Sequence, residues 1–145
     1  MNIRVKKLRE DAILPTYGSD AAAGADLYAL PGESITIGAH KTVMIHTGLS
    51  MELPEGYAGL IFARSGLASK RGLAPANKVG VVDPDYRGEF MVALHNHTDE
   101  ERTVEGGERI AQLVIVPFLS ATFEEYDELS DTARGEGGFG STGTK

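Results

Sequence analysis

Short runs of strand-forming residues alternate with turn-forming residues along most of this chain, and this alternation constrains the fold more than any other feature. The longest runs are Thr42 to Leu53, Glu89 to His97 and Arg109 to Leu119, which are rich in apolar residues. Turn-forming triplets such as Pro54-Glu55-Gly56 and Asp83-Pro84-Asp85 separate the runs. This spacing is typical of an all-β sandwich or barrel.

The remaining strand predictions follow the same pattern and are a first run through Ile3 and Val5, then residues 25–30, 34–37, 57–63 and 79–82, and a last strand over residues 121–129. Only Ser65 to Arg71 has a helical pattern, of about two turns. We expect a turn at Pro15-Thr16-Tyr17-Gly18 and a hairpin-like connection over residues 103–108. The sequence therefore predicts a helix-poor, single-domain, all-β protein.

The composition fits one globular domain and narrows its partners. A chain of 145 residues with 41% apolar and 24% charged residues is long enough for a core of its own. Its formal net charge of −7 argues against general binding to nucleic acid or to anionic membranes. The absence of cysteine excludes disulfides, thiol nucleophiles and thiolate metal sites. Because the start lacks the apolar core of a secretion signal and no run reaches membrane-spanning length, we expect a soluble, cytoplasmic protein.

Asp83 is the first candidate for chemistry. It follows Val81-Val82 and precedes Pro84-Asp85-Tyr86-Arg87-Gly88. In one interpretation this is a β-turn, in which Asp caps its own backbone and Pro presets the next dihedral angle. In the other, a carboxylate held at a strand end beside an aromatic ring and an Arg orients or deprotonates a water.

Arg64-Ser65-Gly66 places a guanidinium and a hydroxyl where the predicted helix begins. Free N–H groups and the positive end of the helix dipole suit an anion there. The alternative is a structural Ser N-cap beside a surface Arg. Ser65 is poorly supported as a hydrolase nucleophile, because the spacing of a nucleophile elbow is absent and no His is recruited to activate it.

The segment from Arg134 to Gly143 is too rich in glycine to build a core and should be mobile on its own. It nevertheless carries one Arg, one aromatic ring, two hydroxyls and many free N–H groups, which together are able to wrap a phosphorylated, ring-bearing ligand. A flexible tail is the alternative. His95 and His97 share a strand face, but two ligands without a third give weak support for a metal site.

Five segments stand in order and at plausible spacing, namely Ala23-Gly24-Ala25-Asp26-Leu27-Tyr28-Ala29, Arg64-Ser65-Gly66-Leu67-Ala68, Val79-Gly80-Val81-Val82-Asp83-Pro84-Asp85-Tyr86-Arg87-Gly88, Gly107-Glu108-Arg109-Ile110-Ala111-Gln112-Leu113 and the glycine-rich tail. Together they resemble the deoxyuridine triphosphate pyrophosphatase (dUTPase) family over nearly the whole chain. The resemblance implies a distorted jelly roll of the β-clip type, with a core over residues 1–132 and a flexible arm over residues 133–145 that closes over the active site. It also implies a homotrimer whose sites lie between subunits, with the arm supplied by a third chain.

The resemblance further implies hydrolysis of dUTP to dUMP and pyrophosphate by attack of water on the α-phosphorus, which limits uracil incorporation into DNA and supplies dUMP for dTMP synthesis. Asp83 would be the general base. Tyr86 would pack under the deoxyribose, so that a ribose 2′-hydroxyl does not fit. The uracil edge would be read by Asn77 and by the backbone of a hairpin through Val79, Gly80 and Val81.

The same resemblance assigns the phosphates to Arg64, Ser65, Gly66 and Gln112. Asp26 would bind, through water, a Mg²⁺ ion that is ligated mainly by the triphosphate. From the arm, Arg134 would clamp the γ-phosphate and Phe139 would stack on uracil. The rest of the closing segment would be Gly140, Ser141 and Thr142.

Two other hypotheses remain open. The related dCTP deaminase branch shares the trimeric fold, but its deamination depends on a glutamate in the strand after the Asp-Pro turn, and Ala93 stands at that position. A non-catalytic nucleotide-sensing or partner-binding protein could also use this scaffold. The presence of all the expected catalytic side chains argues against it.

Overall fold

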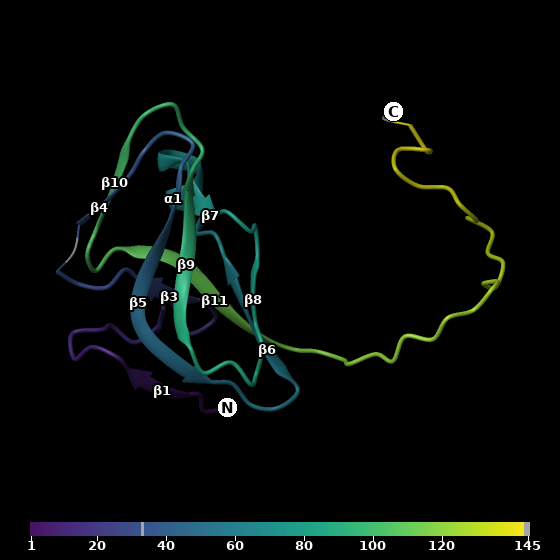
Figure 1. Cartoon of the computed structure of the whole chain (residues 1–145), viewed down its shortest axis with the longest axis horizontal. Coiled ribbons are helices and arrows are strands. Elements are labelled where there is room, and N and C mark those ends of the chain that lie inside the picture. The colour runs from purple at the N-terminus through teal and green to yellow at the C-terminus, as the bar shows by residue number, and fades with distance from the viewer. Residues whose placement is uncertain (33, 144–145) are drawn as a thin grey trace.

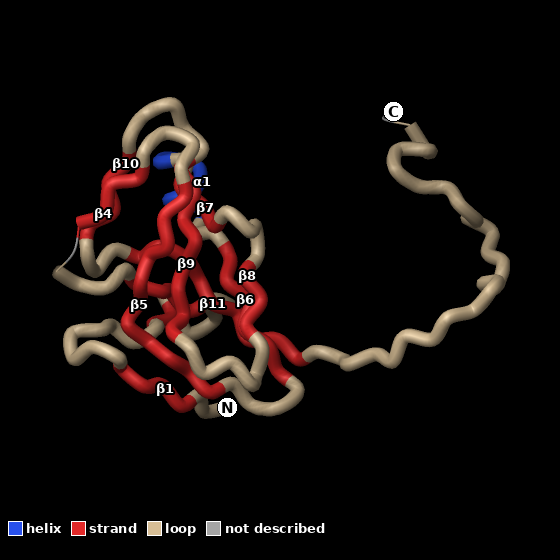
Figure 2. Tube along the Cα trace, in the orientation of Figure 1, coloured by secondary structure: helices blue, strands red, loops and turns tan. Residues whose placement is uncertain are grey.

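The computed structural model describes residues 1–32 and 34–143. The described chain forms eleven strands and one short helix, in the order β1 (Arg4–Lys7), β2 (Thr16–Tyr17), β3 (Ala25–Tyr28), β4 (Ser34–Ile37), β5 (Thr42–Glu52), β6 (Tyr57–Phe62), α1 (Ser65–Arg71), β7 (Leu73–Pro75), β8 (Gly80–Val82), β9 (Glu89–Asn96), β10 (Arg102–Glu105) and β11 (Arg109–Pro117). Figure 2 shows how strongly strands dominate. Among the described residues, no helix has the length and apolarity that crossing a membrane requires.

The strands form an antiparallel sandwich (Figure 1). One sheet has the order β1-β5-β9-β7, a second has the order β2-β3-β11-β6-β8, and β10 pairs with β4 in a small third sheet. Side chains from the two large sheets meet in one core, which joins Ile45, Val92 and Leu94 of the first sheet to Leu27 and Leu113 of the second. The prediction of an all-β, single-domain chain is confirmed.

Strand β9 shows why the sequence pattern produces this sandwich. Its residues alternate between buried and partly exposed, with Phe90, Val92 and Leu94 directed into the core. Alternate side chains of a strand lie on opposite faces, so a period of two buries one face and leaves the other outside. Figure 1 shows β9 beside β5 in the middle of its sheet.

Strand β5 departs from strict alternation because its register with β9 shifts between His46 and Ser50. The shift lies at Gly48, whose φ of +70° is a left-handed conformation that favours glycine. A Cβ at this position would also lie 2.6 Å from the Cδ1 atom of Leu30. Gly48 therefore allows β5 to bend and to bury residues on either side of the shift.

Asn96 is a fully buried polar residue that joins two turns at one end of the sandwich. Its Nδ2 atom donates to the carbonyl oxygens of Ile37, Gly38 and Glu100 at 3.0, 3.2 and 2.7 Å. Its Oδ1 atom accepts from the backbone N–H of Thr98 at 2.9 Å. Buried amides are tolerated only when they are paired in this way.

The strands predicted between residues 25 and 119 lie within two residues of their observed bounds, and the helix is confirmed over Ser65–Arg71. The predicted last strand over residues 121–129 is wrong. That segment leaves the body after β11 and extends away from it without forming a strand (Figure 1). Leu119 and Phe123 are 98% and 96% exposed. A strand needs a partner edge, and no described part of this chain offers one there.

Two turn predictions are also wrong. Residues 103–108 do not form a hairpin, because β10 pairs with β4 while β11 pairs with β3 and β6. The connection therefore passes from one sheet to another. Thr16 and Tyr17, which were expected in a turn, pair with Asp26 and Ala25 as the short edge strand β2. Local turn chemistry does not report which strand becomes the partner.

Asn96→Asp is expected to lower the free energy of unfolding by about 3 kcal/mol or more, because it replaces a donor facing three carbonyl oxygens with an acceptor. Urea denaturation would measure this change. The matched control is Asn2→Asp on the exposed N-terminal segment, for which we expect no measurable effect. Equal stability of the two variants would contradict the structural role of Asn96.

Candidate active site

The first of two candidate hollows gathers the residues predicted to hold phosphates. It has a volume of about 380 Å³ and is lined by Gly18, Ala22, Gly24, Asp26, Arg64, Ser65, Gly66 and Gln112. These residues come from the connection between β2 and β3, from β3 and β11, and from the start of α1, which are far apart in the sequence. The structure therefore brings together all five residues predicted for the phosphates and the metal, and we call this the phosphate hollow.

Asp26 is the electrostatic centre of the phosphate hollow. The Nε atom of Arg64 donates to its Oδ1 at 2.8 Å, and Nη1 of Arg109 donates to its Oδ2 at 3.4 Å. The Asp26 side chain is only 13% exposed, which strengthens its pairing with Arg64 relative to a surface ion pair. Two guanidinium groups around one carboxylate leave a net positive charge, and this suits an anion.

Sequence reasoning missed the position of Arg109. A sequence signal that could have identified Arg109 was present, because this residue lies in the Gly107 to Leu113 motif segment that also contains Gln112. The pairing of β11 with β3 sets Arg109 opposite Tyr28 and Gln112 opposite Asp26. Strand pairing therefore places this side chain within reach of Asp26.

Gln112 and Gly24 fit together in the same hollow. The Nε2 atom of Gln112 donates to the carbonyl oxygen of Ala63 at 2.8 Å, immediately before Arg64. A Cβ on Gly24 would overlap the Oε1 atom of Gln112. Glycine at position 24 thus leaves room for the Gln112 amide. Gly24 is part of the first motif segment, but the sequence alone did not explain why a glycine stands there.

The start of helix α1 differs from the predicted alternative in which Ser65 is the N-cap. Arg64 is the N-cap residue, with extended backbone, and Ser65 is the first helical residue, so the Ser N-cap interpretation is wrong. Within residues 1–32 and 34–143, the Ser65 hydroxyl makes no side-chain hydrogen bond, while its carbonyl oxygen accepts from Ser69 Oγ at 2.7 Å. The hydroxyl is therefore available to a ligand in the phosphate hollow.

The second hollow, which we call the nucleoside hollow, has a volume of about 220 Å³. It gathers five of the predicted residues, Asn77, Gly80, Val81, Asp83 and Tyr86. Its other walls are apolar or come from β9, and comprise Met44, Ile61, Val82, Glu89, Phe90 and Met91. Apart from Val82, these walls come from β5, β6 and β9, which carry no motif, so sequence reasoning did not find them.

A hairpin was predicted through Val79, Gly80 and Val81. This prediction is wrong, because the strands on either side of Val79 are not paired with each other. β7 pairs with β9 in one sheet, and β8 pairs with β6 in the other. The connection between them crosses the edge of the sandwich, and Lys78 takes a positive φ of 66° there. Val79 itself donates to the carbonyl oxygen of Asn77 at 2.7 Å and does not line the hollow.

Asp83 begins the predicted β-turn, but its carboxylate does not cap the backbone among the described residues. The N–H of Tyr86 donates to the Asp83 carbonyl oxygen at 3.2 Å, so the β-turn is formed. The Asp83 carboxylate has no hydrogen-bond partner among the described residues and faces the nucleoside hollow. The turn therefore holds a free carboxylate at the end of β8.

The Tyr86 ring is fixed beside Asp83. Its hydroxyl donates to the carbonyl oxygen of Glu89 at 2.9 Å, and its ring lies 6.1 Å from the ring of Phe90, at 51°. A Cβ at Gly88 would overlap the Tyr86 ring. The ring is thus held across the turn as a flat surface on one side of the nucleoside hollow.

The predicted arm residues are not brought to either hollow. Arg134 donates through Nε to the carbonyl oxygen of Gly137 at 2.6 Å, within the arm itself. The Phe139 ring is fully exposed, and none of the residues Arg134, Phe139, Gly140, Ser141 and Thr142 lines a hollow of the body. Thr144 and Lys145, which belong to the predicted arm, lie outside the described residues.

The two strand histidines do not form a metal site with a third ligand in the described part of the chain. Their rings meet edge to face at 4.6 Å, and Nδ1 of His95 is 2.8 Å from the hydroxyl of Thr42. Desolvation, together with the nearby His95, lowers the pKa of His97 below its ordinary value. His97 is therefore mainly uncharged at neutral pH.

Known proteins resemble this chain in both sequence and fold. The family model described as dUTPase matches residues 10–143. This chain belongs to the dUTPase family. The deoxyuridine 5'-triphosphate nucleotidohydrolase of Hydrogenobaculum sp. (strain Y04AAS1) is 50% identical over 145 residues and is covered completely, as is this chain. That of Syntrophotalea carbinolica is 45% identical over 143 residues, covering 99% of this chain and 97% of the relative.

A solved dUTPase has the same architecture. The structure of the Staphylococcus bacteriophage 80alpha dUTPase with dUPNHPP matches with a TM-score of 0.89 and 30% identity, over 98% of each chain. The jelly-roll fold expected of a dUTPase is thereby confirmed. The deaminase alternative gains no support, since Ala93 on β9 carries no carboxylate and lies opposite Met44.

On the phosphate-binding role that the resemblance assigns to Gln112, Gly24→Ala is expected to weaken binding of dUPNHPP about tenfold, because the new methyl group would displace the Gln112 amide and remove one hydrogen bond to the charged ligand. Titration calorimetry would measure the dissociation constant. The control is Gly38→Ala, where a Cβ would meet only the Cγ of Lys41 at 3.4 Å. Unchanged affinity in Gly24→Ala would show that Gln112 does not contact the ligand.

Proposed function

We propose that this dUTPase family member hydrolyses dUTP to dUMP and pyrophosphate. The observation that carries the proposal is the Asp83 carboxylate, which has no partner among the described residues and shares one hollow with Tyr86 and Asn77. Its relatives over the full chain length are named deoxyuridine 5'-triphosphate nucleotidohydrolases. A free carboxylate beside a nucleoside-sized hollow is the arrangement that water-dependent cleavage of a nucleotide needs.

In the proposed reaction, Asp83 takes a proton from a water molecule as the water oxygen bonds to the α-phosphorus of dUTP. The bond between the α-phosphorus and the oxygen that bridges to the β-phosphorus breaks. Pyrophosphate leaves with the electron pair of that bond, and dUMP keeps the new oxygen. Since Asp83 has no partner among the described residues, its oxygens are free to accept from the water.

Recognition of the nucleoside is assigned to the second hollow. The Tyr86 ring is proposed to pack under the deoxyribose, where a ribose 2′-hydroxyl would not fit. Asn77 and the backbone of Val79, Gly80 and Val81 are proposed to read the uracil edge. A wrong base would leave those polar groups unpaired, at a cost of roughly 1–3 kcal/mol each.

The triphosphate is assigned to the phosphate hollow and its groups Arg64, Ser65, Gly66 and Gln112. A triphosphate carries about four negative charges at neutral pH, and these must be offset before another oxygen approaches. Asp26 alone cannot hold a divalent cation, but one carboxylate fits a Mg²⁺ ion that the triphosphate ligates and that Asp26 contacts through water. When bound, Mg²⁺ would neutralise phosphate charge, while Asp26 also orients the Arg64 side chain.

Self-association as a homotrimer with shared sites is part of the proposal. The two hollows have no lining residue in common, so the nucleoside and phosphate groups of one chain are separated. The segment after β11, over residues 118–132, exposes apolar side chains, including Leu119, Phe123 and Leu129. The body in turn has an apolar hollow of about 150 Å³ lined by Ile3, Val5, Pro15, Tyr17, Ala25, Met51, Leu113 and Ile115. Exposed apolar groups on both parts support contact between copies.

We propose the division of the chain into a core over residues 1–132 and an arm over residues 133–145. The arm would close over the substrate of another copy, with Arg134 on the γ-phosphate and Phe139 on uracil. Gly140, Ser141 and Thr142 would complete the closure. An arm that orders only over substrate would exclude bulk water from the reacting phosphate.

Pyrophosphate release from dUTP, dTTP, dCTP and UTP in the presence of Mg²⁺ tests the proposed function. We expect release from dUTP alone. Equal release from all four nucleotides would contradict the uracil and deoxyribose specificity. Binding of dUTP without release would instead assign the protein to nucleotide sensing, and ammonia released from dCTP would assign it to deamination.

Asp83→Asn is expected to reduce kcat for dUTP by several orders of magnitude and to retain dUTP binding, because the amide cannot accept the proton of the attacking water. Steady-state kinetics and calorimetry together measure the two effects. Asp85→Asn is the matched control, two residues along the same turn, and should keep turnover within about threefold. Full turnover in Asp83→Asn would mean that another group supplies the base.

Deletion of residues 134–145 is expected to leave a folded trimer with turnover lowered by at least about a hundredfold, because the deleted segment contacts substrate and not the core. Light scattering after size exclusion gives the mass, and pyrophosphate release gives the rate. A monomer or an unfolded chain would show that this segment holds the protein together. Unchanged turnover would remove it from the active site.

A further inference from the structure

The turn that carries Asp83 is exposed, and something other than the hydrophobic core must hold it in place. Asp85, Tyr86, Arg87 and Gly88 are all exposed residues. A group that activates water must nevertheless be held within about 0.5 Å of its working position. The contacts that fix this turn therefore bear on the rate of the proposed reaction.

The side chain of Arg87 is hydrogen-bonded to the backbone of this turn. Its Nη1 atom donates to the carbonyl oxygen of Pro84 at 2.6 Å and to that of Tyr86 at 3.1 Å. Pro84 directly follows Asp83, and Tyr86 carries the ring that is proposed to pack under the deoxyribose. One guanidinium thus ties together the two parts of the turn that the nucleoside hollow uses.

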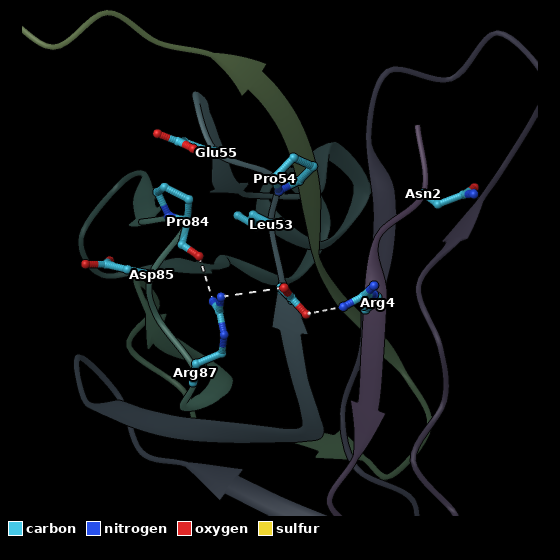
Figure 3. Close-up of a pocket in the computed structure, with 9 residues that line it drawn as sticks. Asn2, Arg4, Leu53, Pro54, Glu55, Pro84, Asp85 and Arg87 are labelled. Carbon is cyan, nitrogen blue, oxygen red and sulfur yellow. Dashed lines mark hydrogen bonds and ion pairs between the residues drawn. The ribbon is translucent and has the colours of Figure 1, made fainter.

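The same guanidinium is anchored to a different part of the fold. Its Nη2 atom lies 3.9 Å from Oε1 of Glu52, the last residue of β5. The other carboxylate oxygen of Glu52 accepts from Arg4 of β1 at 3.5 Å, and the two residues are cross-strand partners. Figure 3 labels Arg4, Arg87 and Pro84 on this line of side chains, and its dashed lines mark the contacts that Glu52 and Arg87 make. The Ser50 hydroxyl also donates to the Arg87 carbonyl oxygen at 2.7 Å, which holds the backbone.

The exposure of Arg4, Glu52 and Arg87 indicates whether these ion pairs affect global stability or only the conformation of the turn. The side chains of Arg4, Glu52 and Arg87 are 86%, 45% and 55% exposed, around an open hollow of about 410 Å³. Exposed ion pairs contribute little to global stability. Hydrogen bonds from Arg87 to two carbonyl oxygens can still select one conformation of a six-residue turn. The geometry therefore favours a local positioning effect over a stabilising one.

We propose that Arg87, held by Glu52, is a positioning residue that sets the orientation of the Asp83 carboxylate. The inference rests on the proposed function. Arg87 lies on the outer side of the turn, away from the lining of both candidate hollows, and acts on the reaction only through Asp83 and Tyr86. Its planar guanidinium directs Nη1 to the two carbonyl oxygens while Nη2 faces Glu52, an arrangement that the single nitrogen of a lysine does not reproduce.

The test is steady-state kinetics on dUTP with Arg87→Ala, Arg87→Lys, Glu52→Gln and the double variant Glu52→Gln/Arg87→Ala. We expect Arg87→Ala to lower kcat about tenfold or more while KM changes less than about threefold, since displacement of the base slows chemistry more than it weakens ground-state binding. Arg87→Lys should fall between Arg87→Ala and the unchanged protein. Glu52→Gln should lose about threefold in kcat, and the double variant should be no slower than Arg87→Ala, because both changes remove the same constraint.

The control is Arg4→Ala, which removes the outer partner of Glu52 but touches no carbonyl of the turn, and should keep kcat within about twofold. Unchanged kcat in Arg87→Ala, or additive losses in the double variant, would overturn the inference. A loss in Arg87→Ala accompanied by unfolding, with full activity in Arg87→Lys and Glu52→Gln, would also overturn it in favour of a purely structural role. If the unchanged protein releases no pyrophosphate from dUTP, the proposed function itself is wrong.

Discussion

The register of β11 between its two neighbours is the constraint on which the phosphate hollow depends. β11 is hydrogen-bonded to β3 on one side and to β6 on the other, so Gln112 lies opposite both Asp26 and Phe62. A slip of one residue would turn Gln112 to the other face and carry the buried Leu113 to its place. Because Arg64 follows Phe62 by two residues, the same register brings its guanidinium to Asp26. The charges of the site are therefore set by the pairing of the sheet that holds the core.

The nucleoside hollow depends on a different kind of constraint. Its walls come mainly from β5, β6, β8 and β9, but Asp83 and Tyr86 lie on a turn and Asn77 lies on a crossing connection, where no strand ladder fixes the backbone. Hydrogen bonds from Arg87, Ser50 and Tyr86 take over that function around Asp83. The charged groups around Asp26 are thus placed by strand pairing, whereas the Asp83 turn is held by side-chain hydrogen bonds. This division matches the proposed chemistry, since charge neutralisation tolerates more displacement than proton transfer to a carboxylate.

Several features were predictable because they are local. Alternation over Glu89 to Asn96 predicted β9, and the isolated helical pattern predicted α1 over its full length. The predictions failed where strand pairing decides the structure. The short β7 carries no alternating pattern of its own and was missed, while residues 121–129 have strand-like composition but leave the body of their own chain. The sequence predicts only a hairpin-like connection over residues 103–108 where β10 forms, because the partner of β10, β4, lies more than sixty residues earlier.

The sequence by itself determined the class of the fold and the candidate residues of the site, because motif residues and strand periodicity are properties of neighbouring positions. Asp83, Tyr86, Asp26, Arg64 and Gln112 could all be named in this way. Only the tertiary structure decided that they divide between two hollows, that Arg109 joins Arg64 around Asp26, and that Arg87 grips the turn of Asp83. These are contacts between residues distant in the chain, and their geometry follows from strand register and burial, which no local pattern encodes.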